Sequence, residues 1–153
     1  MFKKAFIFLV QTITLITIVI FFSCNRLWGD HPLGNNFSLL KGDCKEDMVI
    51  VFCSKGRGIC QGGIFVVPTY ERHMLNGNYA EYVEDAEANK RWIVAKTFQI
   101  IERKQYYWII DKDNIDCEKN YCDSIIQSHV TGPLNLNDFK GKVRALNIDI
   151  EFE

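Results

Sequence analysis

The body of this chain is divided into short apolar runs, and this division most constrains the fold it can adopt. Clusters of glycine, aspartate and lysine separate three runs rich in β-branched and aromatic residues, at residues 37–40, 48–54 and 64–68. Such runs, when they end at turn-forming residues, are typical of β-strands joined by tight turns. The pattern predicts an antiparallel meander.

Two further runs, residues 92–101 and 106–111, flank a polar connection at 102–105, the pattern of a hairpin. The meander therefore has about five expected strands. Near the end of the chain Asn135 is a candidate N-cap. It precedes four apolar residues at spacings of three, four and three, which fit one face of a helix: Leu136, Phe139, Val143 and Leu146. That helix would cover the apolar face of the sheet, so we expect a single α+β domain over residues 36–150.

Three local questions stay open at this level. Residues 71–90 mix helix-forming alanine and glutamate with residues that favour strands. The stretch 122–131 has the composition of a short helix that ends before Gly132 and Pro133. Successive residues of a strand face opposite sides, so either Trp108 or its neighbours would be exposed if one face of the sheet met solvent. An exposed aromatic residue there would mark a partner surface, and ordinary sheet packing is the alternative.

The amino terminus has the order of a secretory signal. Lys3 and Lys4 precede an apolar region of eighteen residues, 5–22, which ends at Ser23 and Cys24. We therefore expect residues 1–23 to be a signal peptide and residues 24–35 to be a tether.

The competing interpretation is an uncleaved transmembrane anchor. Eighteen helical residues span roughly 27 Å, close to the thickness of a bilayer core, although four polar residues interrupt the run. Under either interpretation the two lysines stay in the cytoplasm and residues 25–153 lie across the membrane. The expected location is thus the cell envelope, facing the periplasm or the exterior.

The remaining five cysteines are interpreted in that oxidising setting, where disulfides persist. Cys53 and Cys60 lie across a glycine-rich turn, and Cys117 and Cys122 lie across a polar loop, so each pair is a candidate local disulfide. Cys44 would be unpaired. The alternative is a zinc site or a thiol-dependent site built from the same four cysteines, although six and four intervening residues depart from the usual spacing of zinc ligands.

Composition and motifs exclude several function classes. Removal of residues 1–23 takes away two lysines and no acid, which leaves 16 basic and 19 acidic side chains, too acidic for nucleic-acid binding. His31, His73 and His129 are far apart and belong to no metal-binding motif. We find no nucleophile elbow and no phosphate-binding loop, and so expect no catalytic residue, no metal and no cofactor.

Two resemblances add to this interpretation. The sequence "FFSC" at residues 21–24 resembles the lipobox of bacterial lipoproteins, with phenylalanine where leucine is commoner, and this implies that Cys24 is acylated. The body resembles small uncharacterised bacterial lipoproteins built around a domain of unknown function, through "GGIFVVP", "WIVAKTF", "YYWIIDKD" and "GPLNLNDF". That resemblance implies an extracytoplasmic domain tethered to the membrane and carries over no activity.

The sequence thus predicts a lipid-anchored binding or interaction module rather than an enzyme. Its expected partners are the membrane, through Cys24, and an envelope protein or soluble ligand. Asn25 rather than aspartate after the cysteine favours the outer membrane by analogy with known lipoproteins.

Overall fold

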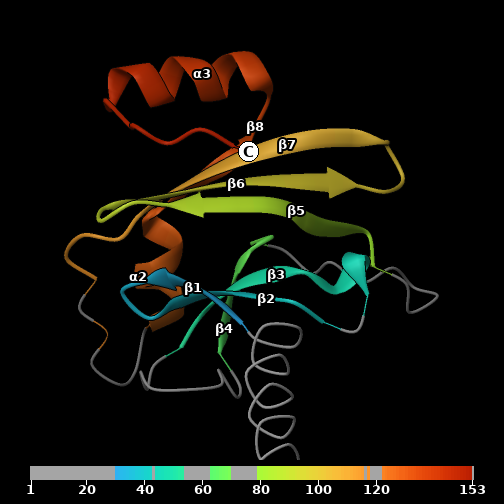
Figure 1. Ribbon diagram of the computed structural model, residues 1–153, viewed down its shortest axis with the longest axis horizontal. Helices are drawn as coiled ribbons and strands as arrows, with labels where there is room; N and C mark the ends of the chain where they lie inside the picture. The colour runs from blue at the N-terminus through green and yellow to red at the C-terminus, as the bar shows by residue number, and fades with distance from the viewer. Residues whose placement is uncertain are drawn as a thin grey trace, which may run out of the picture.

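The computed structural model describes residues 30–42, 44–53, 63–69, 79–115, 117 and 122–152, and its strands form two antiparallel sheets that face each other (Figure 1). Strand order follows chain order in each sheet. The first sheet contains β1 (His31–Gly34), β2 (Phe37–Leu40), β3 (Val49–Phe52) and β4 (Ile64–Val67). The second contains β5 (Glu81–Ala88), β6 (Trp92–Gln99), β7 (Lys104–Asp111) and β8 (Val130–Leu134). The predicted α+β class and meander order are confirmed, with eight described strands in two sheets in place of about five in one.

Three strands, β1, β5 and β8, were not predicted, each for a local reason. β1 lies within the segment 24–35 expected to be a tether, and its pairing with β2 makes residues 31–34 part of the domain. β5 mixes four acidic residues with alanine, tyrosine and valine, which explains the ambiguous composition of that stretch. β8 includes Gly132 and Pro133, which were expected to end a helix; as an edge strand it tolerates a proline. The preceding helix, α2 (Cys122–Ser128), ends just before it.

The main core lies between the two sheets. Inward-facing residues of both sheets form one buried cluster, which includes Phe37 and Ile50 from the first sheet and Val83, Ile93 and Trp108 from the second. The cluster extends to α2 through Ile126, which is fully buried. The short 3-10 helix η1 (Lys45–Asp47) precedes β3.

The second sheet is covered on both faces. Helix α3 (Leu136–Ala145) lies on the face of this sheet that points away from the first sheet (Figure 1). A second cluster forms there from Trp92, Val94, Tyr107, Ile109, Phe139 and Ile148. Trp108 on the inner face and Tyr107 on the outer face are therefore both buried. Both sides of this strand are covered, as ordinary sheet packing implies, because the helix and the chain after it cover the outer face, and neither ring marks an exposed partner surface.

The predicted N-cap of α3 is confirmed. The Asn135 side chain accepts a hydrogen bond of 3.0 Å from the backbone N–H of Asp138, which satisfies one free donor of the first turn. Of the predicted apolar face, Phe139 is buried and Val143 is half-buried. Leu136 and Leu146 are 43% and 44% exposed, so only the middle of the predicted stripe packs on the sheet.

Lys112 joins the two sheets at one end. Its buried ammonium group donates hydrogen bonds to the backbone carbonyls of Leu33, in β1, and of Asn89, just after β5. The Asn35 side chain donates to the Lys112 carbonyl at 3.2 Å. Burial lowers the pKa of Lys112.

Within the parts of the chain that the structure describes, no helix is long and apolar enough to cross a membrane.

Candidate functional site

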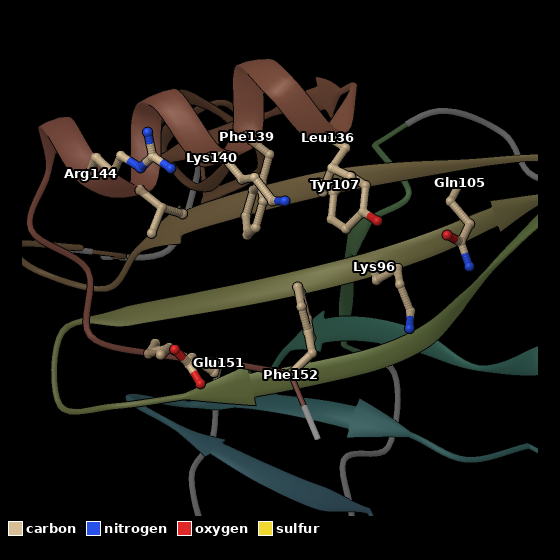
Figure 2. Close-up of a pocket in the computed structure, with 11 residues that line it drawn as sticks. Lys96, Gln105, Tyr107, Leu136, Phe139, Lys140, Arg144, Glu151 and Phe152 are labelled. Atoms are coloured by element: carbon tan, nitrogen blue, oxygen red, sulfur yellow. The ribbon is translucent and has the colours of Figure 1, made fainter.

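A groove between α3, the outer face of the second sheet and the C-terminal segment is the strongest candidate for a binding site (Figure 2). Its volume is about 560 Å³. It is lined by residues of β6, β7, α3 and the last residues of the described chain: Lys96, Gln105, Tyr107, Leu136, Phe139, Lys140, Val143, Arg144, Ile150, Glu151 and Phe152. This volume falls within the range of small-molecule sites in proteins, about 300 to 1,000 Å³.

Three aromatic rings from different elements meet in this groove. Tyr107 of β7 stacks on Phe139 of α3 with ring centroids 4.9 Å apart, and Phe152 lies 5.9 Å from Phe139 and 6.2 Å from Tyr107. Tyr107 reaches this side because alternate residues of β7 point outward, whereas Trp108 points into the sandwich. The rings give the groove an apolar surface that also presents aromatic faces.

Two cationic side chains of α3 stand beside these rings. Lys140 and Arg144 are four residues apart and so lie on the same side of the helix, and both line the groove. Figure 2 shows their side chains on the helix side, above the sheet. Lys142 lies between them in sequence and does not line the groove.

A third cation comes from the sheet. Lys96 of β6 is the direct register partner of Tyr107 on β7, so both side chains are on the outer face. Its ammonium group lies 5.7 Å from the centroid of the Phe152 ring, in a cation–π arrangement. Gln105 donates a hydrogen bond of 2.7 Å to Glu84, and Glu151 is the acidic residue of the lining.

A second unusual feature is the fully buried Glu81 between the two sheets. Neither of its carboxyl oxygens makes a hydrogen bond of normal geometry within the described residues. Burial raises the pKa of Glu81, while the nearby Thr97 hydroxyl and Trp108 indole N–H lower it in part. The indole N–H itself donates to the Thr97 hydroxyl at 3.0 Å. Glu81 is thus a buried acid that favours its neutral form, enclosed in the core and apart from the groove.

The structure brings together one of the two expected cysteine pairs. Cys117 and Cys122 form a disulfide with their α-carbons 5.1 Å apart. Cys53 is disulfide-bonded as well, and its expected partner Cys60 lies outside the described residues. Cys44 is a free, exposed cysteine. Because a disulfide sulfur is not a thiolate, three of the four cysteines of the zinc interpretation are not metal ligands in this state.

The other residues singled out in the sequence form no common site. His31 is in β1 of the first sheet, whereas His129 lies between α2 and β8. The His129 ring contacts the Asp111 carbonyl at 3.1 Å. His73 and the expected lipidation residue Cys24 lie outside the described residues. Across the described ranges, no group of three or more histidine, cysteine or acidic side chains is arranged to hold a metal ion.

Comparisons with protein-family models, with curated proteins and with solved structures found no match to this chain. The resemblance to small bacterial lipoproteins therefore stays a prediction.

Sequence reasoning found the apolar helical residues of the groove, Leu136, Phe139 and Val143, but not the groove or its cations. Tyr107 was noted only as part of an aromatic run, and Lys96, Lys140 and Arg144 were not singled out. The available signal was the spacing of Lys140 and Arg144 beside Phe139 on an expected helix. That signal gains its meaning only when the helix is docked on the outer face of the sheet that carries Lys96 on β6 and Tyr107 on β7.

Proposed function

We propose that this chain is a lipid-anchored extracytoplasmic module that binds its ligand or partner in the groove beneath α3. The groove is the observation that carries the binding role, because it combines a concave shape, an aromatic surface and several cationic side chains. The packing of the two sheets does not require a groove with this combination of side chains on the outer face of the second sheet.

The anchoring part of the proposal rests on the sequence of residues 1–24. A basic start, an apolar region and a serine–cysteine junction support signal cleavage before Cys24 and acylation of that cysteine. Several acyl chains on one residue give stable attachment, since each buried methylene contributes about 0.8 kcal/mol. The proposed location is the cell envelope, with the outer membrane favoured by Asn25.

The arrangement of the fold agrees with this role. The first described strand, β1, belongs to the first sheet, whereas α3, which forms one wall of the groove, lies on the far side of the second sheet (Figure 1). A chain held at its amino terminus can therefore present the groove away from its attachment point.

The anchor is tested by the intact mass of the protein extracted from membranes. We expect the loss of residues 1–23 together with added acyl mass. Cys24→Ser should remain unprocessed, whereas Cys44→Ser, which changes the exposed free cysteine of the described body, should be processed as the wild type is. An unmodified mass that includes residues 1–23 would show an uncleaved anchor instead.

The binding role is tested separately with envelope extracts. Wild-type protein and a Lys140→Glu/Arg144→Glu variant are used as baits under equal loading, and the proposal expects a bound molecule that is lost from the variant. Equal recovery by both baits, or measurable catalytic turnover without any bound partner, would contradict it.

The thiol-dependent or zinc-binding alternative gains no support from the described cysteines. Thiol titration of the folded chain discriminates between the two functions, because disulfides leave few reactive thiols and a zinc site releases metal when its thiolates are modified.

A further inference from the structure

We propose that the groove binds a small organic anion in which a carboxylate is attached to an apolar or aromatic group. This inference rests on the proposed function, since it names the ligand class of the same groove. It follows from three properties of the lining: its charge, its rings and its size.

The first property is an excess of positive charge. Lys96, Lys140 and Arg144 line the groove, and Glu151 is the acidic side chain among the lining residues. Within the described part of the chain, none of the three cations forms an ion pair. The ion pairs among the described residues lie elsewhere, as between Arg91 and Asp111, where the nitrogen and oxygen are 2.8 Å apart. The groove thus has cationic groups available for an anion.

The second property is the position of the rings relative to these cations. Tyr107, Phe139 and Phe152 lie together in the lining of the groove, and the Lys96 ammonium group already lies over the Phe152 ring. Figure 2 shows the sheet-borne Lys96 and the helix-borne Lys140 and Arg144 on different sides of the rings. A ligand that packs an apolar group on the rings therefore has cations within the same groove for its carboxylate.

The third property is size and placement. A volume of about 560 Å³ suits one small molecule better than an extended protein surface. A membrane surface is a poorer match, because the lining is concave and closes around one small volume.

The test uses the full chain in phosphatidylcholine nanodiscs and two fluorescent probes that differ only in charge. Dansylglycine carries a free carboxylate, and dansylglycinamide is its neutral amide. We expect saturable binding of dansylglycine, with fluorescence above that of empty nanodiscs, and affinity for the amide lower by about tenfold, the effect of one charge-assisted contact.

Substitutions in α3 locate the site. Lys140→Glu and Arg144→Glu should each weaken dansylglycine binding by about tenfold or more. Lys142→Glu makes the same change of charge on the same helix outside the groove, and should stay within about twofold, the effect of long-range charge alone. Phe152→Ser should weaken both probes, because it removes a ring from the shared apolar surface.

Several outcomes would overturn the inference. Equal affinity for dansylglycine and dansylglycinamide would mean that the groove does not recognise the carboxylate. Equal losses of dansylglycine affinity in Lys140→Glu and Lys142→Glu would mean that the net charge of the helix, rather than a contact in the groove, determines binding. A dimer of the full chain that dissociates in Lys140→Glu would make a second copy the occupant. A partner protein captured through Lys140 and Arg144, with no dansylglycine binding, would overturn the ligand class while the proposed binding module stands. An absence of acyl mass would overturn the anchor and leave this inference in place.

Discussion

Replacement of Glu81 by glutamine should make the protein more stable at neutral pH, and the gain should depend on pH. Glu81 is fully buried between the sheets, and its carboxyl oxygens have no hydrogen-bond partner in the described chain. Glutamine has nearly the same shape and cannot ionise. The substitution therefore removes the free energy needed to bury a charged carboxylate and leaves the packing around Trp108 in place.

The sign and the slope follow from proton linkage. Burial raises the pKa of Glu81 above its ordinary value of 4.5, so the folded state holds this proton more tightly than the unfolded state does. The contribution of Glu81 to the free energy of unfolding of the wild type therefore falls as the pH rises above 4.5, until the pH passes the pKa of this group in the folded state. The advantage of Glu81→Gln should grow over that window by up to about 1.4 kcal/mol for each pH unit. Below the window both proteins are neutral at this position, and the advantage is smallest.

The assay is urea unfolding of the full chain in non-ionic detergent at several pH values from about 4 to about 7.5, which spans the start of this window. The difference between variant and wild type cancels the titration of all other groups. Glu87→Gln on the same strand is half-buried and controls for the general effect of losing an acidic side chain. A difference between Glu81→Gln and wild type that stays constant across the pH range would mean that burial of Glu81 does not disfavour its charged form.

Two further substitutions test the packing of the sandwich. A β-carbon at Gly132 would lie 2.4 Å from Cε3 of the fully buried Trp108, and Gly132 has a φ of +154°. Gly132→Ala should therefore lower the free energy of unfolding by about 2 to 4 kcal/mol and lower Tm by several degrees. Gly141→Ala in α3 meets no atom within 4 Å and should instead stabilise by about 0.5 to 1 kcal/mol; equal Tm values for the two variants would contradict this account. Lys112→Met leaves two carbonyl acceptors without their donor and should lower the free energy of unfolding by about 2 kcal/mol or more, as urea unfolding would measure. Lys90→Met in the adjacent exposed turn is its control, and an equal loss in both variants would show that the Lys112 hydrogen bonds do not hold the sheets together.

Much of the second sheet was predictable because its signals are local. The apolar alternation of β6 and β7 and the polar connection between them specify a hairpin, and the structure pairs these strands without a register shift from Trp92 to Gln99. The start of α3 was predictable in the same way, since Asn135 caps its first turn through contacts only three residues away.

The sequence also determined the class of the fold and the order of the strands. Short runs of β-branched residues separated by turn residues permit little other than a meander, because each turn returns the chain beside the strand it has just left. The disulfide between Cys117 and Cys122 was predictable from the sequence too, because the loop between these cysteines is short.

Only the tertiary structure decided which faces are covered and where a groove remains. Trp108 and Tyr107 point to opposite sides, and both are buried because the first sheet covers one side and α3 the other. Lys96 and Lys140 are 44 positions apart by their numbers, and no local pattern relates them. They line one groove because the helix docks against β7 and β8 on the outer face of the second sheet, where Lys96 projects from the neighbouring strand β6. Periodicity records which residues share a face of one element, and the packing of distant elements determines what that face meets.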